Sequence, residues 1–536
     1  MFLSLSLYIH ITSLYNSNIM INVLEYLENT MKTINDPNKA AFTGSNDEAL
    51  SFSSLYEICR SCGSYFAKQN TAKQPIAVFM QKSPAMIAAF FGVVSGGNYY
   101  IPLDSEMPAF RIRMILDVVK PSFIICDEAT SAIVSGWKSD NVAGSDAYCD
   151  SIILYEKIID HPVDEDALQK IRRNAIDTDP IYVVFTSGST GIPKGVVATH
   201  RSVIDYIENL SKVLKVTENT IFGNQSPLYL DACLKEVYTT LKFGSSAYLI
   251  PQSLFMFPVK LIEYINEKKI NTICWVASAL SLVAGLGALK ASKPETLHTI
   301  AFGSEVFPVK HYNLWRETLP ETRFIHLYGP TEATGMSCFY ETTRTYGPDE
   351  SIPIGHPFPN TEIILIDENG QVPETGQPGE ICIRGTCLSP GYFADPEKTS
   401  NTFIQNPLSK YPDLIYKTGD LGRRGENDEL YYISRKDHQI KHMGHRIELA
   451  EIEWVANGCD GIGLACAVFD NEKSRIFLFY VTASDSDKIS KSEVRAYLKK
   501  NLPRYMLPHN VYELDELPQT PGGKLDRVKL LKEYCI

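Results

Sequence analysis

The sequence predicts an α/β protein with two domains: a large N-terminal domain of several subdomains, with helix-covered sheets and a β-rich part, and a small α+β C-terminal domain. Three observations support this prediction. The chain has 536 residues, more than one hydrophobic core usually organises. Short apolar runs alternate with amphipathic stretches along most of the chain. Toward the C-terminus this pattern changes twice.

The alternating region extends from about residue 74 to 329. Residues 199–214 place their apolar side chains on one face, which is typical of an amphipathic helix. Between such stretches lie short apolar runs that read as buried strands: IAVFM (76–80), FIIC (123–126), YVVFT (182–186), AYLI (247–250), TICWV (272–276) and RFIHLYG (323–329). Because strands that alternate with helices form parallel sheets with helices on their faces, we expect such sheets here.

The pattern changes at about residue 361, where short strands separated by Gly, Pro and Asp turns predict a β-rich subdomain up to about 432. It changes again after 435. There, residues 445–456 and 490–502 are predicted to be helical, and residues 463–469 and 475–481 to be strands. The predicted domains are therefore 20–434 and 435–536. Residues 1–19 lack Lys, Arg and a cleavage site, so we interpret them as a non-native or mis-started extension rather than a signal peptide.

Charge and cysteine content exclude several classes of protein. The net charge of -12 argues against a general binder of nucleic acid or of anionic membranes, and no apolar run is long enough to span a bilayer. The 12 cysteines show no paired metal spacing, which favours free thiols in the cytoplasm. One C-x-x-C pair, Cys59 and Cys62, lies in a stretch with helical periodicity and is predicted to be buried in a helix.

The stretch YVVFTSGSTGIPKG (182–195) runs from a predicted strand into a loop of small and hydroxyl residues. Such a loop lets backbone N–H groups approach phosphate oxygens, while hydroxyls add donors and a lysine adds charge. It does not fit the Walker pattern G-x-x-x-x-G-K-[ST]. The alternative is a flexible surface turn. We predict a phosphate-binding loop formed by Thr186, Ser187, Gly188, Ser189, Thr190, Gly191 and Lys194.

This stretch resembles the phosphate loop of the adenylate-forming (AMP-binding) superfamily, which includes acyl-CoA synthetases, luciferases and nonribosomal peptide adenylation domains. Four further motifs match in order: LYGPTEAT (327–334), YKTGDLGRR (416–424), SRKDHQIKHMGHRIELAEIE (434–453) and LPQTPGGKLDR (517–527). The resemblance covers nearly the whole chain and extends to free-standing D-alanine:carrier protein ligases.

The resemblance assigns roles to individual residues. It places Tyr328, with Gly329 and Pro330, against the adenine of ATP, and Thr331 near the α-phosphate. Glu332 is the implied ligand of Mg²⁺, which prefers oxygen ligands shared with phosphates. Asp420 is implied to bind the ribose hydroxyls.

Two further motifs carry a hinge and a lysine. Arg435 is implied to reach the nucleotide, and Asp437 to be the hinge about which a mobile C-terminal domain reorients. Lys524 is the implied catalytic residue. It stabilises charge between the substrate carboxylate and the α-phosphate as pyrophosphate leaves.

Asp231, in SPLYLDACLKEV, aligns with the aspartate that pairs with the α-ammonium of an amino-acid substrate. A carboxylate in an apolar pocket predicts a cation; the alternative is an Asp that caps the helix from Ala232. Lys235 would face the substrate side chain, which favours an acidic amino acid, although it could instead pair with Glu236 or point to solvent, and Phe302 would restrict the pocket to a small substrate. The implied substrate pocket is Asp231, Ala232, Lys235, Cys274, Ile300, Phe302, Leu327, Gly335 and Met336, with Lys524.

The resemblance thus implies an enzyme that uses ATP and Mg²⁺ to adenylate an amino acid. The chain ends about a dozen residues after Lys524, so we expect a stand-alone enzyme that passes the aminoacyl group to the phosphopantetheine thiol of a separate carrier protein. An acyl-CoA ligase is the first alternative. A non-catalytic sensor of nucleotide or acyl adenylate is the second, and it would be expected to lose Lys524 or Glu332, both of which are present.

Overall fold

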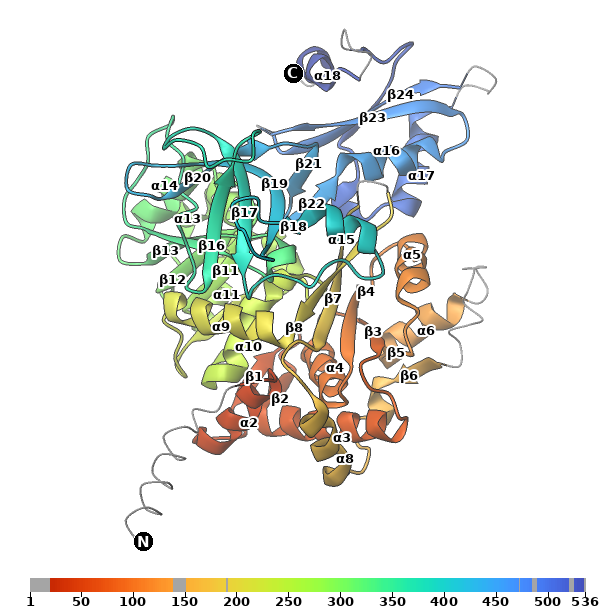
Figure 1. Cartoon of the computed structure of the whole chain (residues 1–536), viewed down its shortest axis with the longest axis vertical. Coiled ribbons are helices and arrows are strands. Elements are labelled where there is room, and N and C mark those ends of the chain that lie inside the picture. Colours follow the sequence, from red (N-terminus) through yellow and green to blue (C-terminus); the bar gives the residue numbers. More distant parts are fainter. Residues whose placement is uncertain are drawn as a thin grey trace.

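The computed structural model describes residues 20–137, 151–188, 191–471, 473–483, 489–519 and 525–534. The predicted extension 1–19 lies outside these residues, as do Ser189, Thr190 and Lys524. A large domain and a small domain are visible in Figure 1, the small one at the top in blue. Among the helices of the described segments, none is long and apolar enough to cross a membrane.

The large domain contains two sheets that are mainly parallel. The first has six strands in the order β6-β5-β3-β4-β7-β8, with only β8 antiparallel to its neighbour. Its strands are β3 (Pro75–Met80), β4 (Tyr99–Asp104), β5 (Phe123–Cys126), β6 (Ile152–Leu154), β7 (Pro180–Thr186) and β8 (Lys194–Thr199). The turn between β7 and β8 is the predicted phosphate loop, so it leaves the carboxyl end of a buried central strand.

The second sheet has nine strands in the order β15-β14-β13-β12-β11-β9-β10-β1-β2. Its six central strands, from β13 to β1 in this order, are parallel. At the two edges the pairing is antiparallel: β2 pairs with β1, β14 with β13, and β15 with β14. The strands are β1 (Ala40–Thr43), β2 (Ala49–Ser51), β9 (Ile221–Asn224), β10 (Ser246–Leu249), β11 (Thr272–Val276), β12 (Thr299–Gly303), β13 (Arg323–Tyr328), β14 (Cys338–Thr342) and β15 (His356–Pro357).

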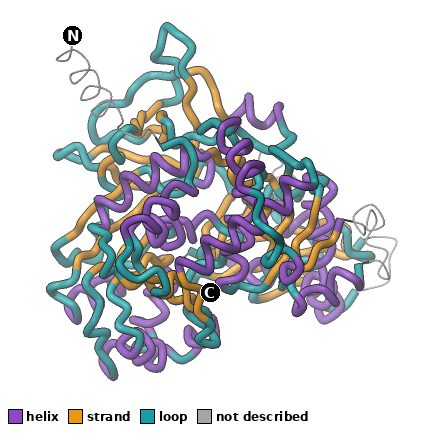
Figure 2. Tube along the Cα trace, turned by 90° about the horizontal axis from the view of Figure 1, so that it is seen from below, coloured by secondary structure: helices purple, strands orange, loops and turns teal. Residues whose placement is uncertain are grey.

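Helices cover both sheets, as the interleaved helix and strand segments of Figures 1 and 2 show. The predicted amphipathic helix is confirmed as α9, and Cys59 and Cys62 are buried in α3 as predicted. The helices are α2 (Leu24–Thr33), α3 (Phe52–Lys68), α4 (Pro84–Ser95), α5 (Ala109–Val119), α6 (Glu128–Gly136), α8 (Glu165–Asn174), α9 (His200–Leu214), α10 (Leu234–Phe243), α11 (Pro258–Glu267), α12 (Ala277–Gly285), α13 (Ala288–Ala291) and α14 (Val309–Thr318).

The predicted β-rich subdomain is an antiparallel sheet of five strands with one short helix, α15 (Pro396–Thr402). It contains β16 (Thr361–Ile366), β17 (Gly379–Gly385), β18 (Phe403–Gln405), β19 (Leu414–Arg424) and β20 (Leu430–Arg435). Asp420 lies on β19 opposite Arg435 on β20. These two predicted nucleotide-binding residues are therefore neighbours because of the strand register.

The small domain begins with a hairpin and continues as a three-stranded sheet with helices. The hairpin pairs β21 (Gln439–His442) with β22 (His445–Glu448). The sheet has the order β23-β24-β25, and the elements are α16 (Leu449–Asn457), β23 (Ile462–Asp470), β24 (Arg475–Thr482), α17 (Lys491–Asn501), β25 (Asn510–Glu513) and α18 (Arg527–Tyr534). In Figure 1 the hairpin lies between this sheet and the large domain.

The prediction of a helix over residues 445–456 is wrong for its first four residues, because His445–Glu448 form β22 and the helix begins at Leu449. The hairpin turn is Met443-Gly444, with φ of 53° and 79°. Two successive residues with positive φ make the tight turn whose twist matches paired antiparallel strands. The turn folds this segment back toward the large domain.

Candidate active site

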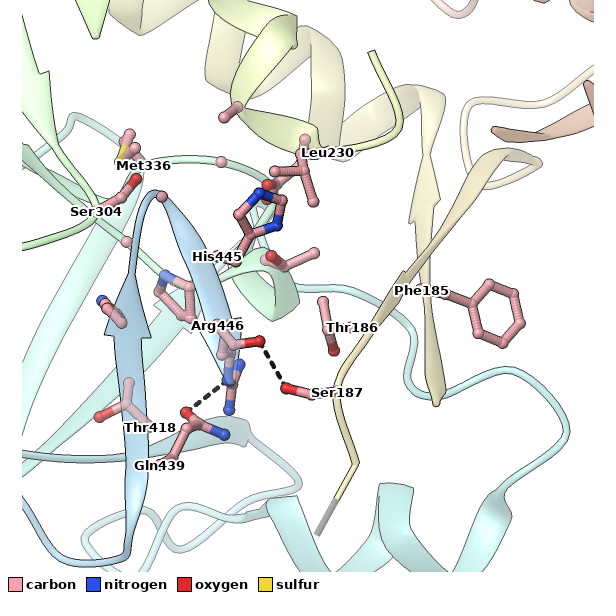
Figure 3. Close-up of a pocket in the computed structure, with 18 of the residues that line it drawn as sticks. Phe185, Thr186, Ser187, Leu230, Ser304, Met336, Thr418, Gln439, His445 and Arg446 are labelled. Carbon is pink, nitrogen blue, oxygen red and sulfur yellow. Dashed lines mark hydrogen bonds between the residues drawn. The ribbon is translucent and has the colours of Figure 1, made fainter. Parts of the chain in front are cut away.

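A cleft that is partly open to solvent lies between the large domain and the hairpin β21–β22. Figure 3 shows side chains from both domains converging on it. Four of the five matched motifs and the Asp231 segment, far apart in the sequence, contribute to its wall. The predicted residues that line it are Thr186, Ser187, Asp231, Ala232, Gly329, Pro330, Thr331, Gly335, Met336, Asp420 and Arg435.

Asp420 is the centre of a buried network on the nucleotide side of the cleft. One of its oxygens accepts a hydrogen bond from the Tyr328 hydroxyl at 2.7 Å, and the other accepts one from Arg435 Nη1 at 2.7 Å. Arg435 also binds both oxygens of Asp437, at 2.7 and 2.8 Å. The side chain of Asp420 is 3% exposed and that of Asp437 is 49% exposed. Arg435 thus links the buried network to the predicted hinge residue.

The described part of the phosphate loop contacts the hairpin. Ser187 Oγ donates a hydrogen bond to the carbonyl of Arg446 at 2.6 Å and accepts one from the N–H of Glu448 at 3.1 Å. Gly188 passes so close to the carbonyl of Ile192 that a Cβ would lie 2.0 Å from that oxygen. This position therefore requires glycine. The loop is held in a tight path against the small domain.

Glu332 is fully buried, and donors of this chain surround its carboxylate. One oxygen accepts a hydrogen bond from the Tyr392 hydroxyl at 2.7 Å and lies 3.3 Å from Lys194 Nζ. A single guanidinium nitrogen of Arg446 lies 3.0 Å from that oxygen and 2.7 Å from the other. Burial would raise the pKa of Glu332, but Arg446 and Lys194 outweigh it and hold the pKa well below its usual range.

Lys194, the last residue of the predicted phosphate loop, is 8% exposed. Burial and the neighbouring Arg446 lower the pKa of its ammonium to about 8, although Glu332 opposes the shift. Its Nζ also lies 5.1 Å from the centre of the Tyr392 ring. Lys194 is therefore held between the Glu332 carboxylate and the Tyr392 ring.

Glu332 is the residue predicted to bind a divalent cation in this site. Mg²⁺ is usually held by one or two carboxylates together with substrate phosphates, so a single glutamate is an adequate protein ligand in principle. One oxygen of Glu332, however, is already contacted by Tyr392, Lys194 and Arg446 and the other by Arg446, so a metal would have to lie beside two cations. In the domain arrangement described here, Glu332 does not fit a metal.

Asp231 begins the short helix η3 (Asp231–Cys233) beside the cleft, and neither η3 nor α10 shows a side-chain cap. This is not the helix-capping arrangement considered as an alternative. The side chain of Thr331 and the backbone of Gly335 donate hydrogen bonds to its carboxylate, while burial raises its pKa. The carboxylate therefore lies next to the YGPT motif, at the junction of the nucleotide side and the side-chain pocket.

A smaller cavity adjoins the cleft beyond Met336. Its wall includes the predicted residues Lys235, Cys274, Phe302, Leu327 and Met336. Lys235 is 4% exposed, so it does not point to solvent. Among the described residues, no carboxylate lies within 4.0 Å of its ammonium, and this includes Glu236. A buried lysine therefore faces a cavity without an ion-pair partner of its own chain in the described segments.

Two of the predicted pocket residues belong to the opposite face of the sheet. In the register of β11, β12 and β13, Cys274 aligns with Ala301 and Ile325, whereas Ile300 and Phe302 alternate with them. Ile300 is core and lines neither cavity. The ring of Phe302 stacks on His326, with centroids 4.9 Å apart. Phe302 therefore contributes to the wall of the smaller cavity, as predicted, while its ring stacks on His326.

The sequence did not indicate that the hairpin would enter the site. Gln439, Lys441, Gly444, His445 and Arg446 all line the cleft. Within the described segments, no residue after Tyr505 lines it. Leu517, Leu525 and Leu530, which flank the segment containing Lys524, belong instead to a core on the sheet β23–β24. In this arrangement the hairpin, rather than any described neighbour of Lys524, is next to Glu332.

Two contacts fix the small domain against the large one. Arg111 of α5 and Glu451 of α16 form an ion pair in which both side chains are almost fully buried. Trp454 of α16 stacks on Phe110 with centroids 6.2 Å apart, and its indole lies over Gly191, where a Cβ would be 2.7 Å away. Both contacts join α5 to α16, and the second also covers Gly191 of the phosphate loop.

The model of the AMP-binding enzyme family matches residues 32–393, and that of the AMP-binding enzyme C-terminal domain matches 451–524. The chain therefore belongs to the AMP-binding, adenylate-forming family of enzymes, whose members use ATP, and the predicted family is confirmed. The matched segments include the phosphate loop, the Asp231 region and the YGPT motif.

The chain is similar to bacitracin synthase 1 of Bacillus licheniformis (31% identity over 85% of this chain and 8% of that protein). It is also similar to an L-proline--[L-prolyl-carrier protein] ligase of Streptomyces coelicolor (29% identity over 85% of this chain and 86% of that protein). It spans less than half the length of the other synthases that it matches, such as gramicidin S synthase 1 of Brevibacillus brevis. These relatives are peptide synthases and a carrier protein ligase.

Among solved structures, the adenylation domain AlmE of Vibrio cholerae, in complex with glycyl-adenosine-5'-phosphate, has a TM-score of 0.81 at 20% identity. The match covers 97% of this chain and 99% of that one. At this identity the likeness concerns the fold. The predicted fold class, a large α/β domain with a small C-terminal domain, is confirmed.

Proposed function

We propose that this protein activates an amino acid with ATP, forming an aminoacyl adenylate and pyrophosphate, and then transfers the aminoacyl group to the phosphopantetheine thiol of a separate carrier protein. The observation that carries the proposal is the position of Asp231. Its carboxylate lies beside Thr331 and Gly335 in the wall of the cleft, and Met336 connects this cleft with the smaller cavity. An α-ammonium bound there would leave the carboxylate of the same amino acid on the nucleotide side.

The nucleotide side supports ATP as the co-substrate. Asp420 offers carboxylate oxygens for ribose hydroxyls next to the Tyr328 ring, and Lys194 supplies a positive charge for the phosphates. The loop glycines allow backbone N–H groups to approach those phosphates. Catalysis would consist mainly of positioning the substrate carboxylate against the α-phosphate of ATP and stabilising the negative charge between them. Lys524 is the residue that we propose to stabilise this charge.

Mg²⁺ is the divalent cation that we propose to accompany ATP, with Glu332 as the protein ligand. It would neutralise phosphate charge when bound. Because Arg446 contacts both oxygens of Glu332 here, the ligand role requires a different position of the hairpin. We therefore propose that the small domain is mobile about Asp437, and we assign no step through the metal in the present arrangement.

The smaller cavity supports an amino acid with an acidic side chain as the substrate. Lys235 has no partner within 4.0 Å in the described segments, and a buried ammonium is stabilised by an anion. Burial raises the pKa of the adjacent Glu236 carboxyl to about 7, so Glu236 is partly protonated at neutral pH and does not fully neutralise Lys235.

Transfer to a carrier protein is supported by the relatives, which are peptide synthases and a carrier protein ligase, and this makes a coenzyme A ligase less favoured. A non-catalytic sensor is disfavoured, because the charged residues predicted to bind ATP and its metal are present: Asp420, Lys194 and Glu332. We place the protein in the cytoplasm, since the ten cysteines in the described segments are free thiols.

The proposal is tested by amino-acid-dependent exchange of labelled pyrophosphate into ATP. The purified protein is given Mg²⁺ and a panel of Glu, Asp, L-Ala, D-Ala, larger amino acids, and fatty and aryl acids. We expect Glu or Asp to dominate. The selected amino acid is then offered with a phosphopantetheinylated carrier protein or with free coenzyme A, and we expect transfer to the carrier. Exchange supported only by acids that lack an amine would overturn the proposal.

A further inference from the structure

Glu236 is a fully buried acid on α10, next to Lys235, and it lines neither the cleft nor the smaller cavity. Its Oε2 accepts a hydrogen bond from Nδ2 of Asn224, at the carboxyl end of β9, at 3.4 Å. Its Oε1 is buried without a hydrogen-bond partner among the described residues, and so is Oδ1 of the same Asn224 amide. Because buried polar atoms are normally hydrogen-bonded, the contact between these two side chains lacks a donor.

A proton on Glu236 Oε1 supplies this donor. A neutral carboxylic acid has one O–H donor and keeps acceptor capacity. It would therefore donate to Asn224 Oδ1 while Oε2 still accepts from Asn224 Nδ2, which closes a cyclic pair of acid and amide. The same proton removes a charge that is costly to bury. Burial accordingly raises the pKa of Glu236 to about 7, although Lys235 and Lys82 oppose the shift.

Two ammonium groups lie near Glu236, but neither forms an ion pair with it. Within the described segments, no lysine Nζ lies within 4.0 Å of its carboxylate. The Nζ of Lys82, which follows β3, donates instead to the carbonyls of Asn224 and Gln225 at 3.3 and 3.2 Å. Lys235 lines the smaller cavity. The other titratable groups that face Glu236 have pKa values raised by burial and are neutral at neutral pH: Cys233, Cys274 and Tyr206.

We propose that Glu236 is a positioning residue for substrate selection: as a neutral acid paired with Asn224, it leaves the charge of Lys235 available to an acidic side chain of the substrate. This inference rests on the proposed function, in which Lys235 faces that side chain. Without the proton, a buried negative charge next to Lys235 would compensate part of the ammonium charge and would repel a second carboxylate. An acidic side chain would then gain less from binding.

The preference for an acidic side chain should therefore depend on pH. Glutamate and glutamine differ in the charge of the side chain, as do aspartate and asparagine. As pH rises through the pKa of Glu236, about 7, the ratio of kcat/KM for the acid to that for its amide should fall. We expect a fall of about tenfold, which corresponds to an interaction of one pKa unit between the two carboxylates. Groups that act on both substrates alike, such as Lys194, cancel in this ratio.

The first test detects the proton in the substrate-free protein. Infrared difference spectroscopy distinguishes a protonated carboxyl from a carboxylate, and exposed carboxyls already lose their protons at about pH 4. We expect wild type to lose one protonated-carboxyl band with a midpoint at about pH 7, and E236Q to lack this band. K82M removes a cation that favours the charged form, so its midpoint should lie at higher pH. E263Q is the matched control, because Glu263 is an exposed glutamate of α11.

The second test measures selection. Pyrophosphate exchange is followed with Glu against Gln and with Asp against Asn, from about pH 6 to about pH 8.5. In wild type and E263Q, the ratio of kcat/KM for acid to amide should fall as pH rises. In E236Q the ratio should stay high at every pH, because a glutamine amide can form the same two hydrogen bonds with Asn224 as the neutral acid. A merely structural role would change the rates with both substrates and leave the ratio unchanged.

Several results would overturn the inference. They are a protonated-carboxyl band that remains in E236Q, a wild-type ratio that does not change with pH, or a ratio in E236Q that changes as in wild type. If E236Q does not fold, the infrared midpoints of wild type and K82M decide, and equal midpoints would contradict the placement of the proton. Absence of exchange with every amino acid would contradict the proposed function and this role with it. The infrared band does not depend on any substrate, so it separates the two failures.

Discussion

Replacing Lys235 with methionine should have opposite effects on activity and on stability. Lys235 is buried at 4% exposure and has no carboxylate within 4.0 Å in the described segments, so in the free protein the more distant Asp231 and Glu236 compensate its charge only in part. Methionine is of similar length and apolar. We expect the free energy of unfolding to rise by about 1 to 4 kcal/mol, as when a buried charge is replaced by a well-packed apolar side chain.

Activity with an acidic substrate should fall in the same variant. Removing one partner of a buried charge pair leaves the other unpaired, at a cost of roughly 3 kcal/mol, which corresponds to about 150-fold in kcat/KM. Exchange with apolar amino acids of similar size should increase relative to Glu or Asp. The Lys212→Met variant is the matched control, because Lys212 is an exposed lysine on α9.

The assay is pyrophosphate exchange over a series of concentrations of each amino acid, combined with denaturant unfolding of the substrate-free protein. A K235M variant with unchanged amino-acid preference would refute the reasoning about the pocket, whatever its stability. Lower stability would refute the statement that the lysine is unpaired in the free protein. A change in both properties in K212M would show that the effects do not come from this cavity.

Three other perturbations test separate parts of the site. Arg111→Met leaves Glu451 buried without its cation, which should weaken docking of the small domain on the large one by about 3 kcal/mol and increase acrylamide quenching of Trp454 fluorescence. Adding Glu451→Leu should restore docking. Equal quenching in R111M and wild type would contradict this prediction. Asp420→Asn should weaken ATP binding by about 10- to 100-fold in calorimetry, because Tyr328 and Arg435 lose a charged acceptor, whereas exposed Asp428→Asn should not. Burial raises the pKa of Glu236 from its usual value to about 7, so the folded state holds this proton more tightly than the unfolded state does. The free energy of unfolding should therefore fall as pH rises from about 4.5 to 7, by up to about 3 kcal/mol. Glu236→Gln should remove this pH dependence in denaturant unfolding, and an unchanged pH dependence would argue against the assignment to Glu236.

Much of the fold could be predicted because its signals are local. The six apolar runs singled out in the sequence correspond to β3, β5, β7, β10, β11 and β13. Parallel strands buried on both faces read as short continuous apolar runs. The motif residues on the nucleotide side also meet, because Asp420 and Arg435 are fixed by the register of β19 and β20.

The errors have equally physical causes. Residues 445–456 have an apolar spacing compatible with a helix, but the turn at Gly444 and pairing with β21 make His445–Glu448 a strand. In a strand, a shift by one residue moves a side chain to the other face, which is why Ile300 lies in the core and lines neither cavity, whereas Ala301 lines the smaller one.

The hairpin contacts could not be predicted by any local pattern. Arg446 reaches Glu332 from a position 114 residues away in the sequence, and Arg111 reaches Glu451 from a still more distant one. Such pairs form only when two separately folded domains dock. Neither the hydrophobic periodicity around these residues nor their immediate sequence neighbours indicate which residue each one pairs with.

The most direct test of the central claim compares an amino acid with its des-amino analogue in pyrophosphate exchange. The selected amino acid and the carboxylic acid of the same skeleton without the amine are assayed with wild type and with Asp231→Ala. If Asp231 binds an α-ammonium, wild type should strongly prefer the amino acid, and D231A should lose that preference. If the des-amino acid supports exchange equally well in wild type, the protein is not an amino-acid-activating enzyme and the account is contradicted.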